Sequence, residues 1–335
     1  MSNQTSSLEY SHFPVMLSEV LEISSPSPDK KIIDCTFGGG GYSREILKRY
    51  KSFVKAIDRD IKALSAAKDL EKKFPDKFKF YQKKFSELDT ISNENVDVVI
   101  FDLGLSSIQL DDLERGFSFK SKKKLNMTMG LNEISALDAV NNLSEIDLKS
   151  IIKILGEEKE ASMIAKNIIK HRNLKKITNT EDLVKIIEKS KKNFFSNINP
   201  CTKTFQALRI FVNKEITELI NGIINATKKL KPGGKILIIS FHSLEDKIVK
   251  YFFTNFSNNK TKPSRYLPED KLVEPPLFNK YRNKVLRPSK EELEVNHRSR
   301  SAKLRYAIRS ENKFKYPYDL VQRFKKYLDL EAIDV

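Results

Sequence analysis

Apolar and polar positions follow two different periods in the first hundred residues of the chain. Short apolar runs that end at glycine or aspartate predict strands, and longer stretches with an apolar residue at every third or fourth position predict helices. The predicted strands are Lys31–Phe37, Phe53–Ile57, Lys77–Gln82 and Val96–Phe101, and the predicted helices are Tyr42–Arg49 and Ile61–Phe74. Strands that alternate with helices predict an α/β fold, in which helices cover both faces of a mostly parallel sheet.

The alternation stops after the fourth predicted strand. The stretch Asp111–Gly130 is typical of a loop, whereas Ser135–Phe195 has helical spacing, with Ser144 and Thr180 as candidate helix caps. We interpret this part as a small helical module inserted into the sheet domain. The predicted division is 1–112 for the first part of the sheet domain, 113–202 for the module and 203–335 for the second part.

One long amphipathic helix is predicted where the sheet domain resumes. Apolar residues form a broad face from Lys203 to Leu230, and the sequence Lys231-Pro232-Gly233-Gly234 marks the end of the helix. We expect a buried strand at Lys235–Phe241, a further helix from about Ser243 and a final strand within Ala302–Ile308. After Phe256 the chain becomes basic and rich in loop-forming residues.

Composition indicates the setting of the protein and its partners. Lysine and arginine number 61 against 44 aspartates and glutamates, and the net charge of +17 favours contact with a polyanion such as nucleic acid. The chain contains no run of roughly 18 apolar residues and begins with the polar stretch Met1–Tyr10, so we expect no membrane span and no secretory signal.

Cys35 and Cys201 are expected to be free thiols in a cytoplasmic protein. The four histidines lack metal-ligand spacing, and we expect no metal site.

Three acidic residues, Asp34, Asp58 and Asp102, belong to the ends of predicted strands. Carboxyl ends of parallel strands meet at one edge of a sheet, where such sheets bind ligands. The four glycines Gly38–Gly41 let the backbone turn sharply there, and the helix that follows presents free N–H groups to an anionic group. Asp58 lies where a carboxylate would reach the hydroxyls of an adenosine ribose.

The glycine spacing distinguishes between adenosine cofactors. The dinucleotide template G-x-G-x-x-G fails in both registers, because the third position is Ser43 counted from Gly38 and Arg44 counted from Gly39. A glycine turn without this spacing, followed by a ribose acid, favours S-adenosylmethionine. A nicotinamide-dependent oxidoreductase, or glycines that only make a tight turn, are the alternatives that the residues leave open.

Longer motifs resemble the RsmH (MraW) family of bacterial ribosomal RNA methyltransferases. In chain order they are His12–Leu17 (HFPVML), Asp34–Ser43 (DCTFGGGGYS), Ala56–Asp60 (AIDRD), Phe101–Phe119 (FDLGLSSIQLDDLERGFSF), Thr202–Val212 (TKTFQALRIFV), Leu230–Lys247 (LKPGGKILIISFHSLEDK) and Arg298–Arg305 (RSRSAKLR). The resemblance implies a class I, Rossmann-like S-adenosylmethionine methyltransferase sheet with an inserted small helical domain. It implies methylation of the exocyclic N4 of a cytidine in the decoding region of small-subunit ribosomal RNA, either as free RNA or in an assembled small ribosomal subunit. The cofactor contacts that it implies are Gly40, Gly41, Tyr42, Asp58, Phe85, Asp102 and Gln109.

The chain departs from the family pattern at several positions: Gly39 replaces a common arginine, Ile108 a common proline and Lys203 an arginine, and two further departures bear most on the site. Tyr42 replaces the usual histidine of the glycine turn, and the segment 125–130 reads LNMTMG where the family usually has LDMRMD. Asn126 and Gly130 therefore lose carboxylates, and Thr128 loses a guanidinium. These changes motivate an alternative function, a ribosome-assembly RNA-binding factor with weak or lost methyl transfer.

Three residues are candidates for contact with the target base. Ser106 and Ser107 follow the fourth strand, where DNA amino-methyltransferases carry their base-binding loop, and His242 follows a buried strand at the ligand edge. Each has a structural alternative, since the serines can simply shape the loop and His242 can cap the next helix. A strong general base is not required, because the proton can leave to solvent after methyl transfer.

Basic residues around these motifs predict the surface that binds RNA. Phosphate neutralisation by lysine and arginine gives affinity without reading the sequence. The candidates are Arg115, Lys122–Lys124, Lys203, Arg209, Arg282, Lys284, Arg287, Arg298, Arg300, Lys303 and Arg305, with Phe278 and Tyr281 interleaved.

Overall fold

The computed structural model describes residues 14–91, 93–191, 199–258, 275–279, 281 and 283–335. These residues form a six-stranded sheet in the order β3-β2-β1-β4-β5-β6. The strands are β1 (Lys31–Asp34), β2 (Phe53–Asp58), β3 (Phe78–Gln82), β4 (Val96–Asp102), β5 (Leu230–Ser240) and β6 (Lys303–Ile308). Strands β1 to β5 are parallel and β6 is antiparallel to β5. The strand order reverses between β1 and β4, which marks the expected ligand edge.

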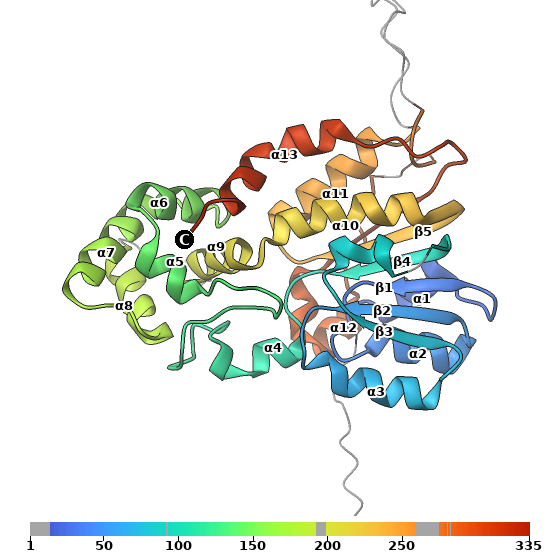
Figure 1. Cartoon of the computed structure of the whole chain (residues 1–335), viewed down its shortest axis with the longest axis horizontal. Coiled ribbons are helices and arrows are strands. Elements are labelled where there is room, and N and C mark those ends of the chain that lie inside the picture. Colours follow the sequence, from blue (N-terminus) through green and yellow to red (C-terminus); the bar gives the residue numbers. More distant parts are fainter. Residues whose placement is uncertain (1–13, 92, 192–198, 259–274, 280, 282) are drawn as a thin grey trace, which may run out of the picture.

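Side chains of the strands alternate between two layers of helices. In β4, Val98 and Ile100 join one buried cluster, and Val99 and Phe101 join the other, as the two-residue period of a strand requires. The first cluster is covered by α1 (Leu17–Ser24), α2 (Gly41–Tyr50) and α3 (Ala63–Lys73). The second is covered by the 3-10 helix η1 (Phe85–Thr90) and by α10 (Glu215–Lys229), α11 (Ser243–Asn255) and α13 (Tyr318–Glu331) (Figure 1). The predicted α/β fold is confirmed.

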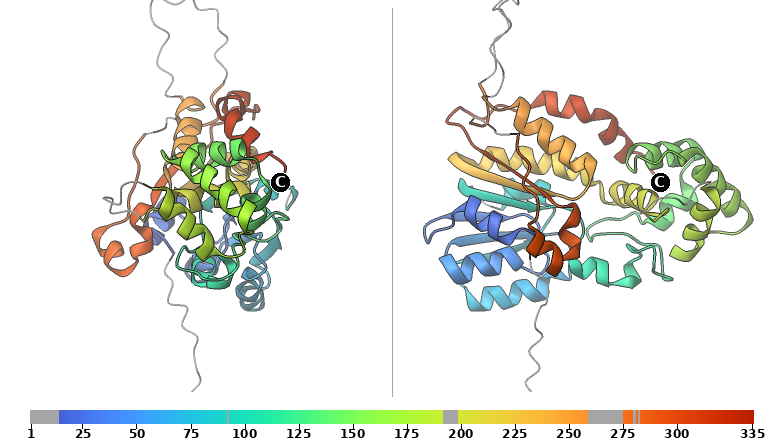
Figure 2. Two further views of the ribbon diagram at one scale, coloured as in Figure 1. Left: turned by 90° about the vertical axis from the view of Figure 1, so that its left-hand side faces the viewer. Right: turned by 180° about the vertical axis from the view of Figure 1, so that it is seen from behind.

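A group of helices lies at one end of the sheet domain (Figures 1 and 2). They are α5 (Ala136–Asn142), α6 (Glu145–Ile154), α7 (Ala161–Leu174), α8 (Thr180–Ser190) and α9 (Thr202–Asn213). Ser144 caps α6 as predicted, but α8 is capped by Asn179, and Thr180 is its first helical residue. The domain bounds at 113 and 202 stay a prediction. Among the described residues no helix combines the length and apolarity needed to cross a bilayer.

The prediction of one long helix from Lys203 to Leu230 is wrong. The chain forms two helices, α9 and α10, with Lys214 between them in the left-handed region at a φ of 49°. Asn213 ends α9 with a buried side chain, whose amide donates to Met127 O at 2.8 Å and whose oxygen accepts from Met129 N at 2.8 Å. These contacts stabilise the break between α9 and α10. The Pro-Gly-Gly sequence follows α10 as expected, but it lies within β5.

The region after Phe256 also contains structure that the sequence pattern did not predict. The elements are α12 (Lys290–Val295), the 3-10 helix η3 (His297–Ser301) and α13. Helix α13 buries Leu320, Phe324 and Tyr327 at helical spacing against the second layer of helices. The final strand β6 lies where it was expected.

Candidate functional site

A cavity of about 340 Å³ opens at the carboxyl edge of the sheet. This volume is within the range of roughly 300–1,000 Å³ that is typical of small-molecule sites. The residues of the predicted cofactor set that line it are Gly41, Tyr42, Asp58, Phe85, Asp102 and Gln109. Gly40 belongs to the turn itself, because its φ is 76° and a Cβ there would lie 2.6 Å from the Phe37 ring.

Asp58 organises the turn that faces the cavity. Its Oδ2 accepts a hydrogen bond from Gly38 N at 2.7 Å, and its Oδ1 accepts one from Asp60 N at 2.8 Å. Burial raises the pKa of Asp58, although the two N–H donors partly oppose that effect. The carboxylate therefore ties the glycine turn to the end of β2, and one edge of it faces the cavity.

Asp102 ends β4 on the same cavity wall and has an unsatisfied oxygen. The hydroxyl of Tyr42 lies 3.3 Å from Asp102 Oδ2 and also donates to Val15 O. Asp102 Oδ1 is buried, and no hydrogen-bond partner for it exists within the described part of the chain. Burial, reinforced by Asp34, raises the pKa of Asp102 to about 8. A buried oxygen of this kind is suited to a cationic or hydrogen-bonding ligand.

Tyr42 stands where the family usually has a histidine, and its side chain makes contacts that support the structure. The side chain is buried, and its hydroxyl connects the segment that precedes α1 to the end of β4. Ser43, the next residue, donates from Oγ to Asp34 Oδ2 at 2.7 Å. Burial raises the pKa of Asp34 to about 6. Tyr42 thus connects the start of α2 to the end of β4, and Ser43 connects it to the end of β1.

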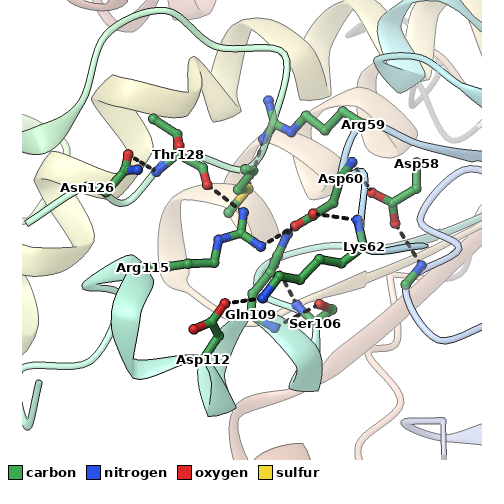
Figure 3. Close-up of polar contacts among 12 residues, drawn as sticks. Asp58, Arg59, Asp60, Lys62, Ser106, Gln109, Asp112, Arg115, Asn126 and Thr128 are labelled. Atoms are coloured by element: carbon green, nitrogen blue, oxygen red, sulfur yellow. Dashed lines mark hydrogen bonds and ion pairs between the residues drawn. The ribbon is translucent and has the colours of Figure 1, made fainter. Parts of the chain in front are cut away.

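Asp60 does not line the cavity but binds Gln109, which does, and the sequence interpretation missed this residue (Figure 3). Its Oδ2 accepts from Gln109 Nε2 at 2.8 Å and from Arg115 Nη1 at 2.5 Å. Arg115 Nη2 also donates to Thr128 O at 2.6 Å. The sequence contained a signal for this residue, because Asp60 is the second acid of the AIDRD motif. This network joins the end of β2 to α4 (Ser107–Asp111), to the 3-10 helix η2 (Leu113–Arg115) and to the atypical segment 125–130.

The three predicted catalytic residues occupy cap positions or begin helices. Ser106 lines the cavity and caps α4, where its Oγ accepts from Gln109 N at 3.3 Å and Gln109 Oε1 accepts from Ser106 N at 3.0 Å. Ser107 is the first residue of α4. His242 caps α11, and its Nδ1 accepts from Glu245 N at 3.4 Å. The structural alternative for His242 is therefore present in the structure, and its catalytic role stays a prediction.

A second polar part of the cavity wall contains an ion-pair network. Arg209 Nε and Nη2 donate to the two carboxylate oxygens of Glu215, each at 2.8 Å. Burial alone would raise the pKa of Glu245, but His242 and Arg209 beside it bring that pKa below its ordinary value. Glu215, His242 and Glu245 place possible metal ligands within 4.8 Å of one another. Because the guanidinium of Arg209 occupies both oxygens of Glu215 and repels other cations, we interpret the group as an ion-pair network.

Several residues assigned to the RNA surface are in the interior. Arg209 pairs with Glu215, and Arg305 donates from Nε to Asp246 Oδ1 at 2.7 Å and is 6% exposed. Phe278 and Tyr281 are buried in the core. Arg115 is largely buried against Asp60. Arg282 lies outside the described residues. The cations that stay exposed are Lys122–Lys124, Lys284, Arg287, Arg298 and Arg300.

The arrangement of sheet, turn and acids defines a class of protein. The glycine turn after β1, the acids at the ends of β2 and β4, and the cavity between them define a class I, Rossmann-like, S-adenosylmethionine-dependent methyltransferase. The chain belongs to the MraW methylase family, whose model matches residues 9–310. This membership confirms the resemblance seen in the sequence, and it excludes the nicotinamide alternative.

Curated relatives resemble the chain along most of its length. The ribosomal RNA small subunit methyltransferases H of Brucella ovis and Brucella abortus are each 42% identical to it over 318 residues, which is 93% of this chain and 91% of each relative. Among solved structures, an rRNA methylase from Streptococcus thermophilus matches with 11% identity and a TM-score of 0.37, over 88% of this chain and 92% of that one.

Gly222 offers a test of the position of Phe85 in the cavity. A Cβ at Gly222 in α10 would lie 2.6 Å from Phe85 Cδ2 and 3.3 Å from Phe101 Cε1. Gly222→Ala is expected to displace the Phe85 ring, to raise the cofactor dissociation constant several-fold and to cost about 1–3 kcal/mol of stability through overpacking. Calorimetric titration with S-adenosylmethionine and thermal unfolding measure both effects. Asn221→Ala, at an exposed position of the same helix, is the control. Equal dissociation constants for the two variants would mean that Phe85 does not contact the cofactor.

Proposed function

We propose that this chain transfers the methyl group of S-adenosylmethionine to the N4 amine of a cytidine in the decoding region of small-subunit ribosomal RNA. The observation that carries the proposal is the family match over residues 9–310, together with relatives of 42% identity that are named ribosomal RNA small subunit methyltransferases. The motifs FDLGLSS and SFHSLED, at the ends of β4 and β5, support it further because both meet at the cavity.

The residues of the cavity fit this cofactor. Asp58 supplies a carboxylate edge to the ribose, Phe85 supplies an aromatic face to the adenine, and the free oxygen of Asp102 suits a positively charged ligand. The bound cofactor supplies an electrophilic methyl group on a sulfonium. The task of the protein is to hold that methyl in line with the cytosine nitrogen, at about 3–3.5 Å, and to exclude water.

The base would enter beside the loop that follows β4. The loop Leu103–Ser106 lines the cavity between Asp102 and the part of the wall formed by Arg209, Glu215 and Glu245. In this proposal Ser106 contacts the cytosine through its hydroxyl and nearby backbone, Ser107 supports that loop, and His242 orients Glu245. The amine proton leaves to solvent after transfer. Recognition would require that the cytidine leaves its stack and enters the pocket.

The exposed cations would hold the RNA backbone around this opening. Arg298 lies on the cavity wall and pairs with Asp111 Oδ1 at the end of α4 at 2.5 Å, and Arg300 follows it in η3. Lys122–Lys124 lie on the loop that leads to the helical group and are exposed. Phosphate contacts of this kind make binding salt-dependent and independent of sequence.

A labelling experiment tests the proposal and its alternative together. Small ribosomal subunits from a strain that lacks the activity are incubated with the protein and methyl-labelled S-adenosylmethionine, and the RNA is digested to nucleosides. We expect label in N4-methylcytidine that maps to one cytidine of the decoding region. Subunit binding without any label would support the assembly-factor alternative, and label in another nucleoside would contradict the N4 assignment. Free small-subunit RNA as a parallel substrate distinguishes the two forms of the partner.

A further inference from the structure

Helix α13 carries a buried carboxylate that the proposed reaction does not use. Glu331, in the last turn of α13, is 1% exposed. Its Oε1 accepts a hydrogen bond from Ile216 N at 2.9 Å, and its Oε2 accepts from Thr217 N at 2.8 Å and from Thr217 Oγ1 at 2.6 Å. The family match ends at residue 310, so Glu331 lies beyond the part of the chain that the family model covers, whereas its partners lie within it.

The three contacts complete the amino end of α10. The first N–H groups of a helix have no partner within the helix and are usually capped by the residue that precedes it. Here that residue is Lys214, which has a left-handed φ of 49° and makes no side-chain cap. Glu331 therefore supplies, from a different helix, the acceptors that the local sequence lacks. The helix dipole also favours Glu331 in its charged form, whereas burial raises the pKa of this residue to about 8.

The capped turn of α10 forms part of the cavity. Glu215 is the first residue of α10, lines the cavity and binds both donors of Arg209. Leu219, one turn further along α10, lines the same cavity. If the first turn of α10 frayed, the Glu215–Arg209 pair would move with it.

The position of α13 itself is set by packing on several elements. It packs against α10 and α11 of the sheet domain and also against α6 and α9 of the helical group (Figure 2). Phe324 of α13 meets Tyr251 of α11 edge to face, with ring centres 5.5 Å apart. The packing of α13 on these four helices therefore fixes the position of Glu331 beside α10.

We propose that Glu331 is a positioning residue for methyl transfer, which holds the first turn of α10 and thereby fixes the Glu215–Arg209 pair on the cavity wall. The inference rests on the proposed function in one respect, that the RNA base meets this part of the wall. It predicts a loss in turnover with little change in cofactor binding, because Asp58 and the glycine turn belong to other elements and Phe85 packs on α10 at Gly222, about two turns from the capped end.

The test compares Glu331→Ala and Glu331→Gln with a control on the same helix. Asp329→Ala removes an exposed acid that pairs with Lys325 Nζ at 2.7 Å, and it should leave every measurement unchanged. For Glu331→Ala, measured well below its unfolding temperature, we expect a dissociation constant for S-adenosylmethionine within about twofold of the original and a kcat on small ribosomal subunits at least about tenfold lower, because misplacement by about 1 Å can cost 10²-fold. Glu331→Gln keeps one acceptor and should lose less.

Amide hydrogen exchange gives a second measurement that does not depend on catalysis. Exchange at Ile216 and Thr217 should accelerate in both Glu331 variants and stay unchanged in the Asp329 variant. If Glu331→Ala does not fold, Glu331→Gln carries the test. A kcat equal to that of the control in a folded variant, or unaltered exchange at these amides, would overturn the inference. An unmodified protein that transfers no methyl group to cytidine would instead reject the proposed function, while the exchange data would still decide the capping role of Glu331.

Discussion

Asparagine in place of Asp102 is expected to weaken the binding of S-adenosylmethionine about tenfold to a hundredfold at pH 8.5, because a hydrogen bond to a charged group contributes roughly 1.5–3 kcal/mol. The carboxylate ends β4 on the cavity wall, and its Oδ1 is buried without a hydrogen-bond partner in the described structure. The cofactor carries a sulfonium group that stays charged at this pH, so a negative charge at this wall favours it. Asparagine keeps the shape of the side chain and removes that charge.

The pH dependence of cofactor binding separates this explanation from simple packing. Burial, then Asp34, Glu245 and Glu292, raise the pKa of Asp102 to about 8, while the hydroxyl of Tyr42 opposes them. The free site therefore holds a proton at neutral pH, and a cationic ligand must displace it. Affinity should rise with pH by up to about tenfold per unit until about pH 8 and then level off. Calorimetry in two buffers of different ionisation enthalpy should detect the released proton.

The stability of the ligand-free protein should change in the opposite direction. The pKa of Asp102 is about 8 in the folded chain against an ordinary value of 3.8. Between these values the folded chain holds a proton that the unfolded chain has released, so this residue makes stability fall as pH rises from about 4 to about 8. Asp102→Asn should remove that contribution and flatten the binding profile. Asp69→Asn, at an exposed site on α3, is the control for net charge. A binding profile of Asp102→Asn that still rises towards pH 8 would assign the titration to another group.

The elements that could be predicted from the sequence are those that a short contiguous segment determines by itself. The central strands carry apolar runs, such as Ile32–Ile33 in β1, Val98–Phe101 in β4 and Ile236–Ile239 in β5, since both of their faces are covered by helices. The acids Asp58 and Asp102 follow such runs directly, and the topology of a parallel sheet brings strand ends together. The glycine turn could be located from the sequence for the same reason, because it directly follows the first of these runs.

The parts that could not be predicted depend on contacts between distant segments. Arg209 and Glu215 are six residues apart, which would place them about 120° apart around one unbroken helix. They pair only because the chain breaks at Asn213 and Lys214, and that break depends on contacts with the segment near Met127. Arg305 was assigned to the surface because its partner, Asp246, is 59 residues away in sequence. Glu331 likewise caps a helix that begins more than a hundred residues earlier.

The segment 125–130 shows how a local departure from a family pattern can be accommodated. Asn126 Oδ1 accepts from Thr128 N at 3.3 Å, and Thr128 O accepts from Arg115. Gly130 has a φ of 76°, and a Cβ there would lie 2.5 Å from Arg59 O. The backbone of this segment therefore favours glycine at 130, and its Thr128 carbonyl joins the network around Asp60 through Arg115.

Alanine in place of Asp58 is expected to raise the dissociation constant of S-adenosylmethionine about 10²-fold to 10⁴-fold, because the proposed ribose contact would lose two charge-assisted hydrogen bonds, each contributing roughly 1.5–3 kcal/mol. The same carboxylate accepts from Gly38 N and Asp60 N, so its loss also leaves the glycine turn without the contacts that shape it. Titration calorimetry on the folded variant measures the effect.

Asp58→Asn divides this loss into its two parts. The amide oxygen can still accept one of the two backbone hydrogen bonds, so the turn should be better ordered than with alanine, while the charge that favours the ribose diol is gone. We expect a dissociation constant between those of the original protein and the alanine variant, and amide exchange at Gly38 closer to that of the original. If both variants bound the cofactor as tightly as the original, the ribose would lie elsewhere, and Asp58 would serve only to join β2 to the turn. An asparagine variant as weak as alanine would mean that the charge of Asp58, and not the order of the turn, dominates cofactor binding.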